Sequence, residues 1–217
     1  MKGDNPYQPW LAKIIDVREE SSGERAIKTF KLEFQDEEIK KNFTFLPGQF
    51  IMISIFGVGE STFAISSSPT QKEYIEVSAM RYGKLTKALH LKEIGDIVGA
   101  RGPYGNNFPV DEWKNKNLLF IGGGIGQAPL RSIINYCIDN RKDYGNLEII
   151  YGARTTKDLC YKLEFAEMAK MDNLSTHLSI DVEEEGWYQF VGFVPANLLR
   201  INPSPENTIA ITCGPPI

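Results

Sequence analysis

The sequence contains few of the residues that bind metals or form disulfides. It has three cysteines, Cys137, Cys160 and Cys213, and two histidines, His90 and His177, in 217 residues. No two cysteines form a C-x-x-C pair, and neither histidine has a carboxylate or a cysteine at the spacing of a metal site. This pattern argues against a disulfide framework, a zinc site and an intrinsic iron–sulfur site, so we predict no metal ligands. It fits a protein of the reducing cytoplasm.

Two further absences exclude whole classes of function. There is no apolar run of roughly 18 residues, so no membrane span is expected, and residues 1–6 lack the apolar segment of a signal peptide. The formal net charge is −4, and lysine and arginine do not gather in one stretch, so no nucleic-acid partner is expected. Hydrophobic residues make up 42% of the chain, enough for one large core or for two domains of about 100 residues each.

A dense group of glycines follows a short apolar run in the second half of the chain. Residues 118–121 have the length of a buried strand, and four glycines lie within residues 122–126. From residue 128 to residue 140, apolar residues recur at the spacing of one helix face, with Pro129 in the first turn. A glycine loop between a strand and a helix lets a phosphate approach the backbone and the helix N-terminus. The unit therefore predicts a nucleotide-binding loop. A tight turn without a ligand is the alternative.

The usual dinucleotide fingerprint is incomplete in this sequence. It expects an acidic residue at the end of the next strand, about 20 residues on. Here the next strand, residues 147–151, ends in Gly152-Ala153-Arg154, and no Walker A lysine follows the glycines. A nicotinamide nucleotide would therefore be held in another way, with Arg154 as a candidate phosphate contact. Because Thr155 and Thr156 add no second basic residue, we expect NADH rather than NADPH.

The first half of the chain reads as β-rich. Residues 28–34 alternate between apolar and charged side chains, which is typical of a half-buried strand. Further strands are predicted at residues 10–17, 50–56, 74–80 and 97–101, with a Pro-Gly turn within residues 45–50 and one helix at residues 84–91. Several short strands separated by turn signals predict a small barrel.

The second half of the chain alternates between strands and helices. Strands are expected to start at Leu118, Leu147, Thr176 and Thr208, and helices at residues 128–140, 159–171 and 195–199. This alternation predicts a parallel sheet with helices on its faces, and we place the two domains at residues 1–110 and 111–217. Three strand ends, residues 122–124, 152–154 and 213–216, are rich in small residues. Because ligands bind beyond the carboxyl ends of parallel strands, we predict that they form one site.

Taken in order, several segments resemble the ferredoxin–NADP reductase superfamily. They are Pro47-Gly48-Gln49-Phe50, Gly83-Lys84-Leu85-Thr86, Gly95-Asp96 with Arg101-Gly102-Pro103-Tyr104-Gly105, the glycines of residues 122–126, and Cys213-Gly214-Pro215-Pro216. Within the superfamily, Asn5-Pro6-Tyr7-x-Pro9 and Gly57-Val58-Gly59-Glu60 look most like the γ subunits of sulfhydrogenases and the FAD/NAD(P)-binding electron-transfer subunit of anaerobic sulfite reductase. The resemblance implies a six-stranded antiparallel flavin-binding barrel followed by an α/β parallel-sheet nucleotide-binding domain, with FAD between them.

The resemblance also implies two sets of cofactor contacts. For FAD they are Thr62, Phe63, Ala64, Ile65, Ser66, Ser67, Arg81, Gly83, Lys84, Leu85 and Thr86. For NADH or NADPH they are Gly122, Gly123, Gly124, Ile125, Gly126, Gln127, Ala153, Arg154, Cys213, Gly214 and Pro215. Within the second set, Cys213 would lie beside the reacting carbon of the nicotinamide, and we assign it the catalytic role.

Two departures from the family pattern concern the cofactors. The family's flavin motif is R-x-[YF]-S, and this sequence keeps Phe63 but has Ser61 in place of the arginine and Ala64 in place of the serine. Losing the arginine removes a charge-assisted contact with the FAD pyrophosphate, so we expect FAD to be held weakly or partly by a partner. The family's C-terminal helix and cysteine-rich tail do not follow residue 216. We therefore expect the second domain to be truncated at Ile217, and a [2Fe–2S] cluster only where such a tail exists.

The function implied by the resemblance is that of an FAD-dependent NAD(P)H oxidoreductase subunit. It would move a hydride between NAD(P)H and the flavin, and relay electrons to or from an iron–sulfur subunit of a larger redox complex. That partner is expected to dock at residues 62–66, near the exposed edge of the flavin. Two alternatives stay open: a non-catalytic assembly subunit with a degenerate flavin site, and a stand-alone diaphorase.

Overall fold

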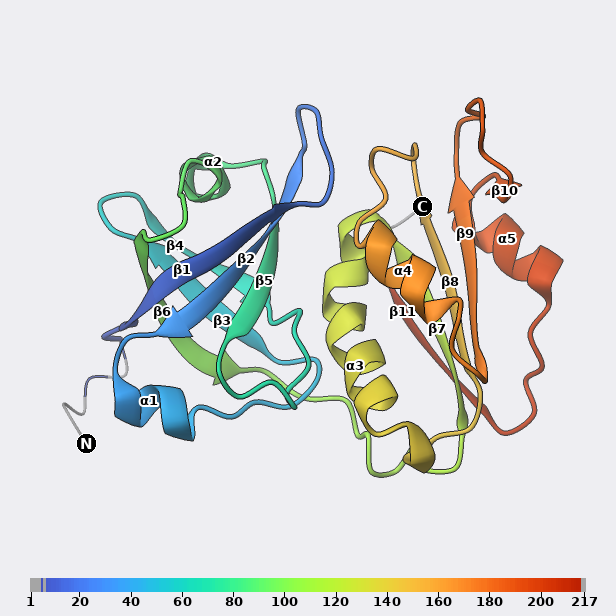
Figure 1. Cartoon of the computed structure of the whole chain (residues 1–217), viewed down its shortest axis with the longest axis horizontal. Helices are drawn as coiled ribbons and strands as arrows, with labels where there is room; N and C mark the ends of the chain where they lie inside the picture. The colour runs from blue at the N-terminus through green and yellow to red at the C-terminus, as the bar shows by residue number, and fades with distance from the viewer. Residues whose placement is uncertain (1–4, 6, 216–217) are drawn as a thin grey trace.

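Two β-sheets of different kinds follow one another along the chain (Figure 1). The computed structural model describes residue 5 and residues 7–215. Residues 1–4, Pro6, Pro216 and Ile217 lie outside the described residues. They include most of the stretch considered as a signal peptide and parts of the N-P-Y-x-P and C-G-P-P segments. The predicted architecture, an antiparallel barrel followed by an α/β parallel sheet, is confirmed.

The barrel half contains the first six strands. They are β1 (Trp10–Glu19), β2 (Ile27–Phe34), β3 (Phe50–Ile55), β4 (Gly59–Ala64), β5 (Ile75–Met80) and β6 (Ile97–Tyr104). They pair in the order β4-β3-β6-β1-β2-β5, and every pairing is antiparallel. A bridge between Ile65 and Val77 joins the segment after β4 to β5, so the two edges of the sheet meet and the barrel closes.

Strand β2 shows why an alternating sequence becomes a barrel strand. Phe30, Leu32 and Phe34 are at most 5% exposed and belong to the barrel core, whereas Lys31 and Glu33 are only half-buried. All six strands contribute residues to this core, and Leu89 of α2 (Lys84–His90) adds to it. Burial of these apolar faces is the main force that holds the barrel together.

Two elements of the barrel half were missed by the residue patterns. Helix α1 (Glu37–Asn42) begins at Asp36, whose side-chain oxygen accepts hydrogen bonds from the backbone N–H groups of Glu38 and Ile39 at 2.9 and 3.1 Å. An aspartate cap followed by acidic residues is a recognisable helix start. Strand β4 was not recognised as a strand because it is polar. It lies next to β3 at the end of the strand order, where Glu60 and Thr62 are exposed to solvent.

The second sheet has five parallel strands. They are β7 (Asn117–Gly123), β8 (Leu147–Ala153), β9 (Leu174–Ile180), β10 (Phe190–Val191) and β11 (Thr208–Cys213), paired in the order β10-β9-β8-β7-β11. Helices α3 (Gln127–Asp139) and α4 (Lys162–Met168) lie on the side of this sheet nearest the barrel, and α5 (Val194–Ile201) lies on the other side (Figure 1). The predicted alternation of strands and helices is confirmed.

Three details of the second half differ from the prediction. Helix α4 begins at Lys162 rather than at residue 159, because Tyr161 has the left-handed φ of 56° and breaks the helical run. Cys160 therefore lies in the loop before α4, not in a helix. Strand β10 has only two residues, which is too short to leave a periodic pattern in the sequence.

Each half has its own apolar core. The barrel core draws its members from residues 12–100, and the other cluster from Val110 onward, with Ile27 of β2 as the exception. Many of the side chains that meet between these cores are polar or charged. Within residue 5 and residues 7–215, no helix has the length and apolar character needed to cross a membrane.

Candidate cofactor site

The three glycine- and proline-rich strand ends lie at one edge of the parallel sheet. Gly123 of β7 pairs with Gly152 of β8, and Gly122 of β7 pairs with Cys213 of β11. The C-terminal ends of β8, β7 and β11 are therefore neighbours, as the prediction of a single site requires. The helical turn of residues 124–126 that follows β7 also contacts β5, so this edge of the sheet faces the barrel.

The four glycines of the loop are required for different reasons. A Cβ on Gly126 would lie 2.5 Å from the carbonyl oxygen of Cys213, and a Cβ on Gly122 would collide with Oε1 of Gln127. Gly123 packs against Pro215, which would lie 3.3 Å from its Cβ. These three glycines thus allow close packing of the loop against the β11 end. Gly124 is different, because its φ is +52° and nothing lies within 4 Å of its Cβ position.

The loop is a short helical turn that continues into α3. Residues 124–126 form a 3-10 turn, and Gln127 begins the α-helix directly after it. The first N–H groups of such a helix have no acceptor within the helix, which makes this end of the helix suited to binding an anion. The open side at Gly124 gives a phosphate or ribose room to approach them.

A buried tyrosine that the sequence reasoning did not identify holds the loop in place. The hydroxyl of Tyr151, on β8, donates a hydrogen bond to the carbonyl oxygen of Gly124 at 3.2 Å and accepts one from the N–H of Cys160 at 3.0 Å. The Tyr151 side chain is fully buried, and burial raises the pKa of its phenol well above the ordinary value. The only signal in the sequence for this role is that Tyr151 lies on the strand next to β7.

Gln127 is buried beneath the loop. It is 2% exposed, and no hydrogen-bond partner of its Oε1 is found among the described residues. Its side chain fills the space that Gly122 leaves open. Ile125 packs against the core of the second half, so neither side chain extends into the open space at Gly124.

The end of β8 carries an acidic contact that the sequence reasoning overlooked. Ala153 is buried and Arg154 is exposed, so Arg154 is free to meet a ligand. The carboxylate of Glu184 accepts a hydrogen bond from Oγ1 of Thr156 at 2.5 Å and from its N–H at 3.3 Å. This places a negative charge next to the segment where a dinucleotide's ribose is usually held.

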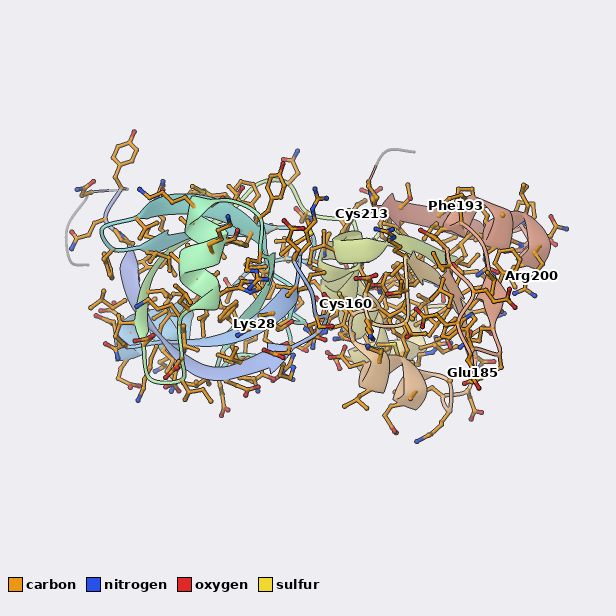
Figure 2. All side chains as sticks on the ribbon, turned by 90° about the horizontal axis from the view of Figure 1, so that it is seen from above. Lys28, Cys160, Glu185, Phe193, Arg200 and Cys213 are labelled. Carbon is orange, nitrogen blue, oxygen red and sulfur yellow. The ribbon has the colours of Figure 1, made fainter. Side chains whose placement is uncertain are left out.

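Cys213 ends β11 with a half-buried thiol. Burial raises the pKa of this thiol, so it stays protonated at neutral pH. Figure 2 shows Cys213 and Cys160 in the part of the parallel-sheet half nearest the barrel, with Phe193, Arg200 and Glu185 toward its far end. Gly214 follows Cys213 and lies against Gly123, so the β11 end and the glycine loop form one surface.

The flavin stretch, which is the segment of residues 62–67 predicted to contact FAD, alternates between the interior and the surface of the barrel. Thr62 is exposed and Ala64 is half-buried, whereas Phe63 is 8% exposed and Ile65 is 1% exposed, both within the barrel core. The Phe63 ring is thus a core side chain rather than an exposed platform. Ser66 and Ser67 are also buried, against the second half, so in this structure only the beginning of residues 62–66 is open to a partner.

The start of α2 is the second predicted FAD contact. Oγ1 of Thr86 accepts hydrogen bonds from the N–H groups of Tyr82 and Gly83 at 2.9 and 3.0 Å, which fixes the helix start. Nothing lies within 4 Å of a Cβ on Gly83, and Lys84 is exposed beside it, with Leu85 turned toward the barrel core. Arg81 donates hydrogen bonds to the carbonyl oxygens of Gly23 and Glu24, in the loop between β1 and β2.

Ser61 stands where the family has an arginine, and we find no free arginine among the described residues that takes its place. Ser61 is half-buried on β4, and Arg101 on β6 is bound to Glu60 by two hydrogen bonds of 2.8 and 2.5 Å. The two side chains of this pair are 19% and 26% exposed, and the bonds from Arg101 lower the pKa of Glu60. The Arg101 guanidinium is therefore already neutralised on the barrel surface.

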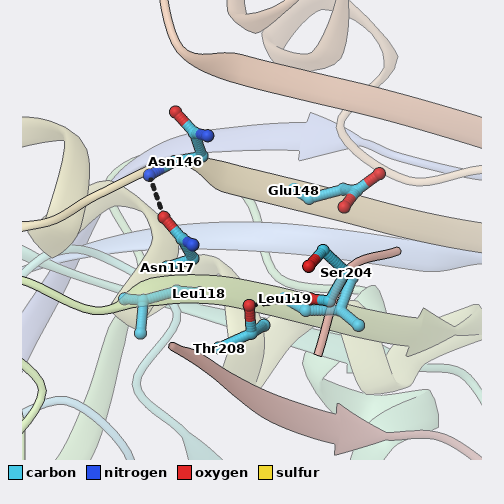
Figure 3. Close-up of a pocket in the computed structure, with 7 residues that line it drawn as sticks. All are labelled: Asn117, Leu118, Leu119, Asn146, Glu148, Ser204 and Thr208. Carbon is cyan, nitrogen blue, oxygen red and sulfur yellow. Dashed lines mark hydrogen bonds between the residues drawn. The ribbon is translucent and has the colours of Figure 1, made fainter. Parts of the chain in front are cut away.

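A pocket lies at the opposite end of the parallel sheet from the candidate site (Figure 3). It is lined by Asn117, Leu118, Leu119, Asn146, Glu148, Ser204 and Thr208. The side-chain oxygen of Asn117 accepts a hydrogen bond from the N–H of Asn146 at 2.9 Å, which links two strand starts. Ligands of parallel sheets bind at the carboxyl ends of the strands, so this pocket is not part of the candidate site.

Comparison with known proteins matches two domain families in succession along the chain. The oxidoreductase FAD-binding domain family matches residues 13–108, and the oxidoreductase NAD-binding domain family matches residues 120–217. The chain is 39% identical to the sulfhydrogenase 1 subunit gamma of Pyrococcus furiosus, over 100% of this chain and 74% of that protein. It is 30% identical to a probable dihydroorotate dehydrogenase B (NAD(+)) electron transfer subunit of Methanocaldococcus jannaschii, over 97% and 70%.

A solved structure shares the fold. The ferredoxin NADP+ reductase from Neisseria gonorrhoeae, solved with bound FAD and NADP, superposes with a TM-score of 0.77 at 18% identity, over 95% of this chain and 85% of that one. The chain belongs to the ferredoxin–NADP reductase family of FAD- and NAD-binding oxidoreductases.

Proposed function

We propose that this chain is the electron-transfer subunit of a redox complex that takes a hydride from NADH onto FAD and passes electrons to an iron–sulfur partner. The observation that carries the proposal is the sheet edge where the neighbouring ends of β7, β8 and β11 carry Gly124, Arg154 and Cys213, with residues 124–126 in contact with β5 of the barrel. This edge joins a phosphate-binding helix start to a thiol, beside the half of the chain that belongs to an FAD-binding family.

We also propose that the two cofactors divide between the segments 1–110 and 111–217. The separate apolar cores support a boundary close to residue 110, since the barrel core ends at Ala100 and, apart from Ile27, the second core begins at Val110. The open space at Gly83 and Gly124 supports the assignment of cofactor contacts, because at both positions a ligand could approach the backbone closely without meeting a side chain.

When bound, FAD accepts a hydride from a nicotinamide nucleotide and can release the electrons one at a time. In the proposed site, residues 124–126 and Arg154 hold the nucleotide phosphates, and the β11 end with Cys213 supports the nicotinamide. The half-buried thiol of Cys213 is uncharged, so it does not disturb the charge that develops during hydride transfer. Thr62 and Ala64 on the outer face of β4, and Gly83 and Lys84 at the start of α2, hold FAD.

The nucleotide in this proposal is NADH rather than NADPH. The Glu184 carboxylate already accepts from the N–H and the hydroxyl of Thr156, which are the donors a 2′-phosphate would need. A phosphate at this position would also be repelled by the same carboxylate. We expect a higher kcat/KM for NADH than for NADPH. Glu184→Gln should reduce this preference by raising kcat/KM for NADPH while leaving the value for NADH unchanged.

The proposal of a partner rests on the relatives, whose names describe subunits of larger enzymes. The names of the two relatives describe subunits of a sulfhydrogenase and of a dihydroorotate dehydrogenase, and our chain matches most of their length. An iron–sulfur protein is the expected acceptor because it takes single electrons from a flavin that has received two. Three free cysteines, two of them fully buried, are compatible with work in the reducing cytoplasm.

The test of this function is anaerobic stopped-flow reduction of the FAD-reconstituted chain by NADH. Gly124→Val provides the matched variant, because its side chain enters the open space where the phosphate should approach. The variant should keep its FAD content and lose NADH-dependent reduction. Its reduction by dithionite should be unchanged, which shows that the flavin itself is intact.

Two results would contradict the proposal. One is a chain that stays colourless after reconstitution with FAD, alone and with co-expressed partners. The other is a Gly124→Val protein that is reduced by NADH as fast as the unmodified chain. Reoxidation should be followed with and without the iron–sulfur subunit, and rapid reoxidation by a physiological acceptor without that subunit would favour a stand-alone diaphorase.

A further inference from the structure

Helix α3 holds the predicted flavin stretch through two consecutive backbone carbonyls. Nη1 of Arg131 donates a hydrogen bond to the carbonyl oxygen of Ser66 at 2.9 Å. Oγ of Ser132, the next residue, donates to the carbonyl oxygen of Ser67 at 2.7 Å. Further along, the hydroxyl of Ser68 donates to Asp139, the last residue of α3, at 2.7 Å. The segment after β4 therefore lies along the helix that begins at the glycine loop.

Arg131 is buried and surrounded by partners from both halves of the chain. It is 8% exposed, and Nη1 also donates to the Glu76 carboxylate of β5 at 2.6 Å. Its Nε and Nη2 both donate to the Glu164 carboxylate of α4, each at 2.7 Å. The guanidinium carbon lies 4.9 Å from the centre of the Tyr161 ring.

The positive charge of the Arg131 guanidinium is balanced by two carboxylates, those of Glu76 and Glu164. Burial would lower the pKa of Arg131, but its bonds with Glu164 and the charge of Glu76 raise it, so it stays charged. Glu76 is shared, because its other oxygen accepts from Nη1 of Arg18 on β1 at 2.8 Å. Arg18 also pairs with Asp16 and Glu20, so its carboxylate partners all belong to the barrel half.

The helix between the glycine loop and these contacts is a rigid spacer. Arg131 lies five residues after Gly126, which is roughly 7 to 8 Å along a helix at 1.5 Å per residue. The same element thus carries the start of the nucleotide site and fixes residues 66 and 67 of the flavin stretch. A change in either contact would shift one cofactor segment relative to the other.

We propose that Arg131 and Ser132 are positioning residues that set the distance between the nicotinamide and the flavin, by holding the carbonyls of Ser66 and Ser67 to helix α3. The inference rests on the proposed function, because it assigns the flavin to the stretch that Arg131 holds. Hydride transfer needs the reacting atoms about 3 to 3.5 Å apart, and a misplacement of about 1 Å can slow catalysis on the order of 100-fold.

An arginine is required at residue 131 because of its planar fork of donors. Lysine would keep the positive charge but could not bind the Ser66 carbonyl, Glu76 and both oxygens of Glu164 at the same time. Arg131→Lys is therefore the informative variant. Arg18→Lys is its matched control, since it makes the same change at the other arginine on Glu76 without touching α3 or Ser66.

The experiment compares the unmodified chain, Arg131→Lys, Ser132→Ala and Arg18→Lys in two measurements. The first is stopped-flow reduction by NADH, with the rate, the NADH dissociation constant and the long-wavelength absorbance of the stacked nicotinamide and flavin recorded separately. The second is hydrogen exchange of residues 65–71 in the chain without cofactors. This measurement reports the contacts with α3 whether or not the chain is active.

For Arg131→Lys we expect the reduction rate to fall about 10-fold or more and the long-wavelength band to weaken, while the FAD content and the NADH dissociation constant stay within about twofold. Exchange of residues 65–71 should be faster. Ser132→Ala should act in the same direction with a smaller effect. Arg18→Lys should leave the rate, the band and the exchange of this segment unchanged.

Several outcomes would overturn the inference. Unchanged rates and unchanged exchange in both α3 variants would show that the carbonyl contacts position nothing. Equal losses in Arg18→Lys and Arg131→Lys would show that the Glu76 charge cluster only stabilises the barrel. If Arg131→Lys does not fold, the reduction rate and the hydrogen exchange of Ser132→Ala alone decide whether the inference holds. If the unmodified chain is not reduced by NADH, the proposed function fails, and the exchange measurement still decides whether α3 holds this stretch.

Discussion

The two predicted cofactor segments are held in opposite ways. The glycine loop of residues 122–126 is fixed by its own half, through Gly126 against Cys213 and through the Tyr151 hydroxyl on Gly124. The flavin stretch is fixed from outside, because the carbonyls of Ser66 and Ser67 are held by α3 of the other half. The nucleotide segment is thus a property of one sheet, whereas the flavin segment depends on how the two halves are docked.

This difference indicates which forces set the geometry between the cofactors. Apolar burial gives each half its stability but has no preferred direction. The contact between the halves contains Glu76 at 3% exposed and Arg131 at 8%, and their hydrogen bonds require particular distances and angles. Variants that affect one segment and spare the other test whether the two segments are held independently.

The largest effect is expected from Glu76→Gln. The change leaves the buried guanidinium of Arg131 and the half-buried one of Arg18 without their shared charge. Removing one partner of a buried ion pair costs about 3 to 5 kcal/mol, so the free energy of unfolding in urea should fall by that amount. Glu60→Gln is the control, because its pair with Arg101 is more exposed than the Glu76 pair with Arg131 and should contribute much less to stability. Equal losses of unfolding free energy in the two variants would show that the pairs of Glu76 contribute no more to stability than the Glu60–Arg101 pair.

Gly126→Ala should come next and should affect the nucleotide segment only. Its Cβ would lie 2.5 Å from the Cys213 carbonyl oxygen, so the β11 end or the loop must move. Overpacking of this kind costs about 1 to 3 kcal/mol, and NADH-dependent reduction should be lost while FAD stays bound. Gly83→Ser, at an open helix start, should change stability by less than about 0.5 kcal/mol. Normal reduction by NADH in Gly126→Ala would show that the close packing is not needed.

Tyr151→Phe should have a smaller effect on the same loop. It removes the hydroxyl that joins the Gly124 carbonyl to the Cys160 N–H, and an unsatisfied buried group costs about 1 to 3 kcal/mol. We expect a raised KM for NADH with kcat little changed, measured by steady-state dye reduction. Tyr144→Phe is the control, since the Tyr144 hydroxyl binds Val110 and not the loop. A KM that rises equally in both variants would rule out a specific role for Tyr151.

The smallest effect is expected from mild acid. Burial alone would raise the pKa of Glu76, but Arg131 and Arg18 outweigh it, so its pKa lies below the ordinary value of 4.5. A lowered pKa in the folded state adds stability above the unfolded pKa, and that stability is lost as the pH falls through the folded pKa. Between pH 7 and about 5, Glu76 should therefore contribute no change. Urea midpoints of the unmodified chain and of Glu76→Gln should stay equally far apart over this range and converge only in stronger acid.

Local patterns were enough to predict most of the fold. The alternation in residues 28–34, the strand–glycine–helix unit around residue 122 and the strand–helix alternation after it all correspond to elements of the structure. These signals are short-range, since each depends on neighbours within one strand or one helix. They did not predict β4 and β10, because a polar edge strand and a two-residue strand leave no periodic pattern.

Consecutive residues were sufficient to specify the pair of folds and the place of the nucleotide loop, because periodicity and glycine spacing are local properties of the chain. The meeting of residues 66–67 with Arg131 and Ser132, 65 positions later, arises only when the two halves dock. Strand β5 shows the physical reason. Its sequence predicts one buried face with Ile75, Val77 and Ala79, yet Glu76 and Ser78 on its other face are also buried. Their burial comes from α3 and Tyr161 of the other half, and no pattern within β5 records which distant residues will cover it.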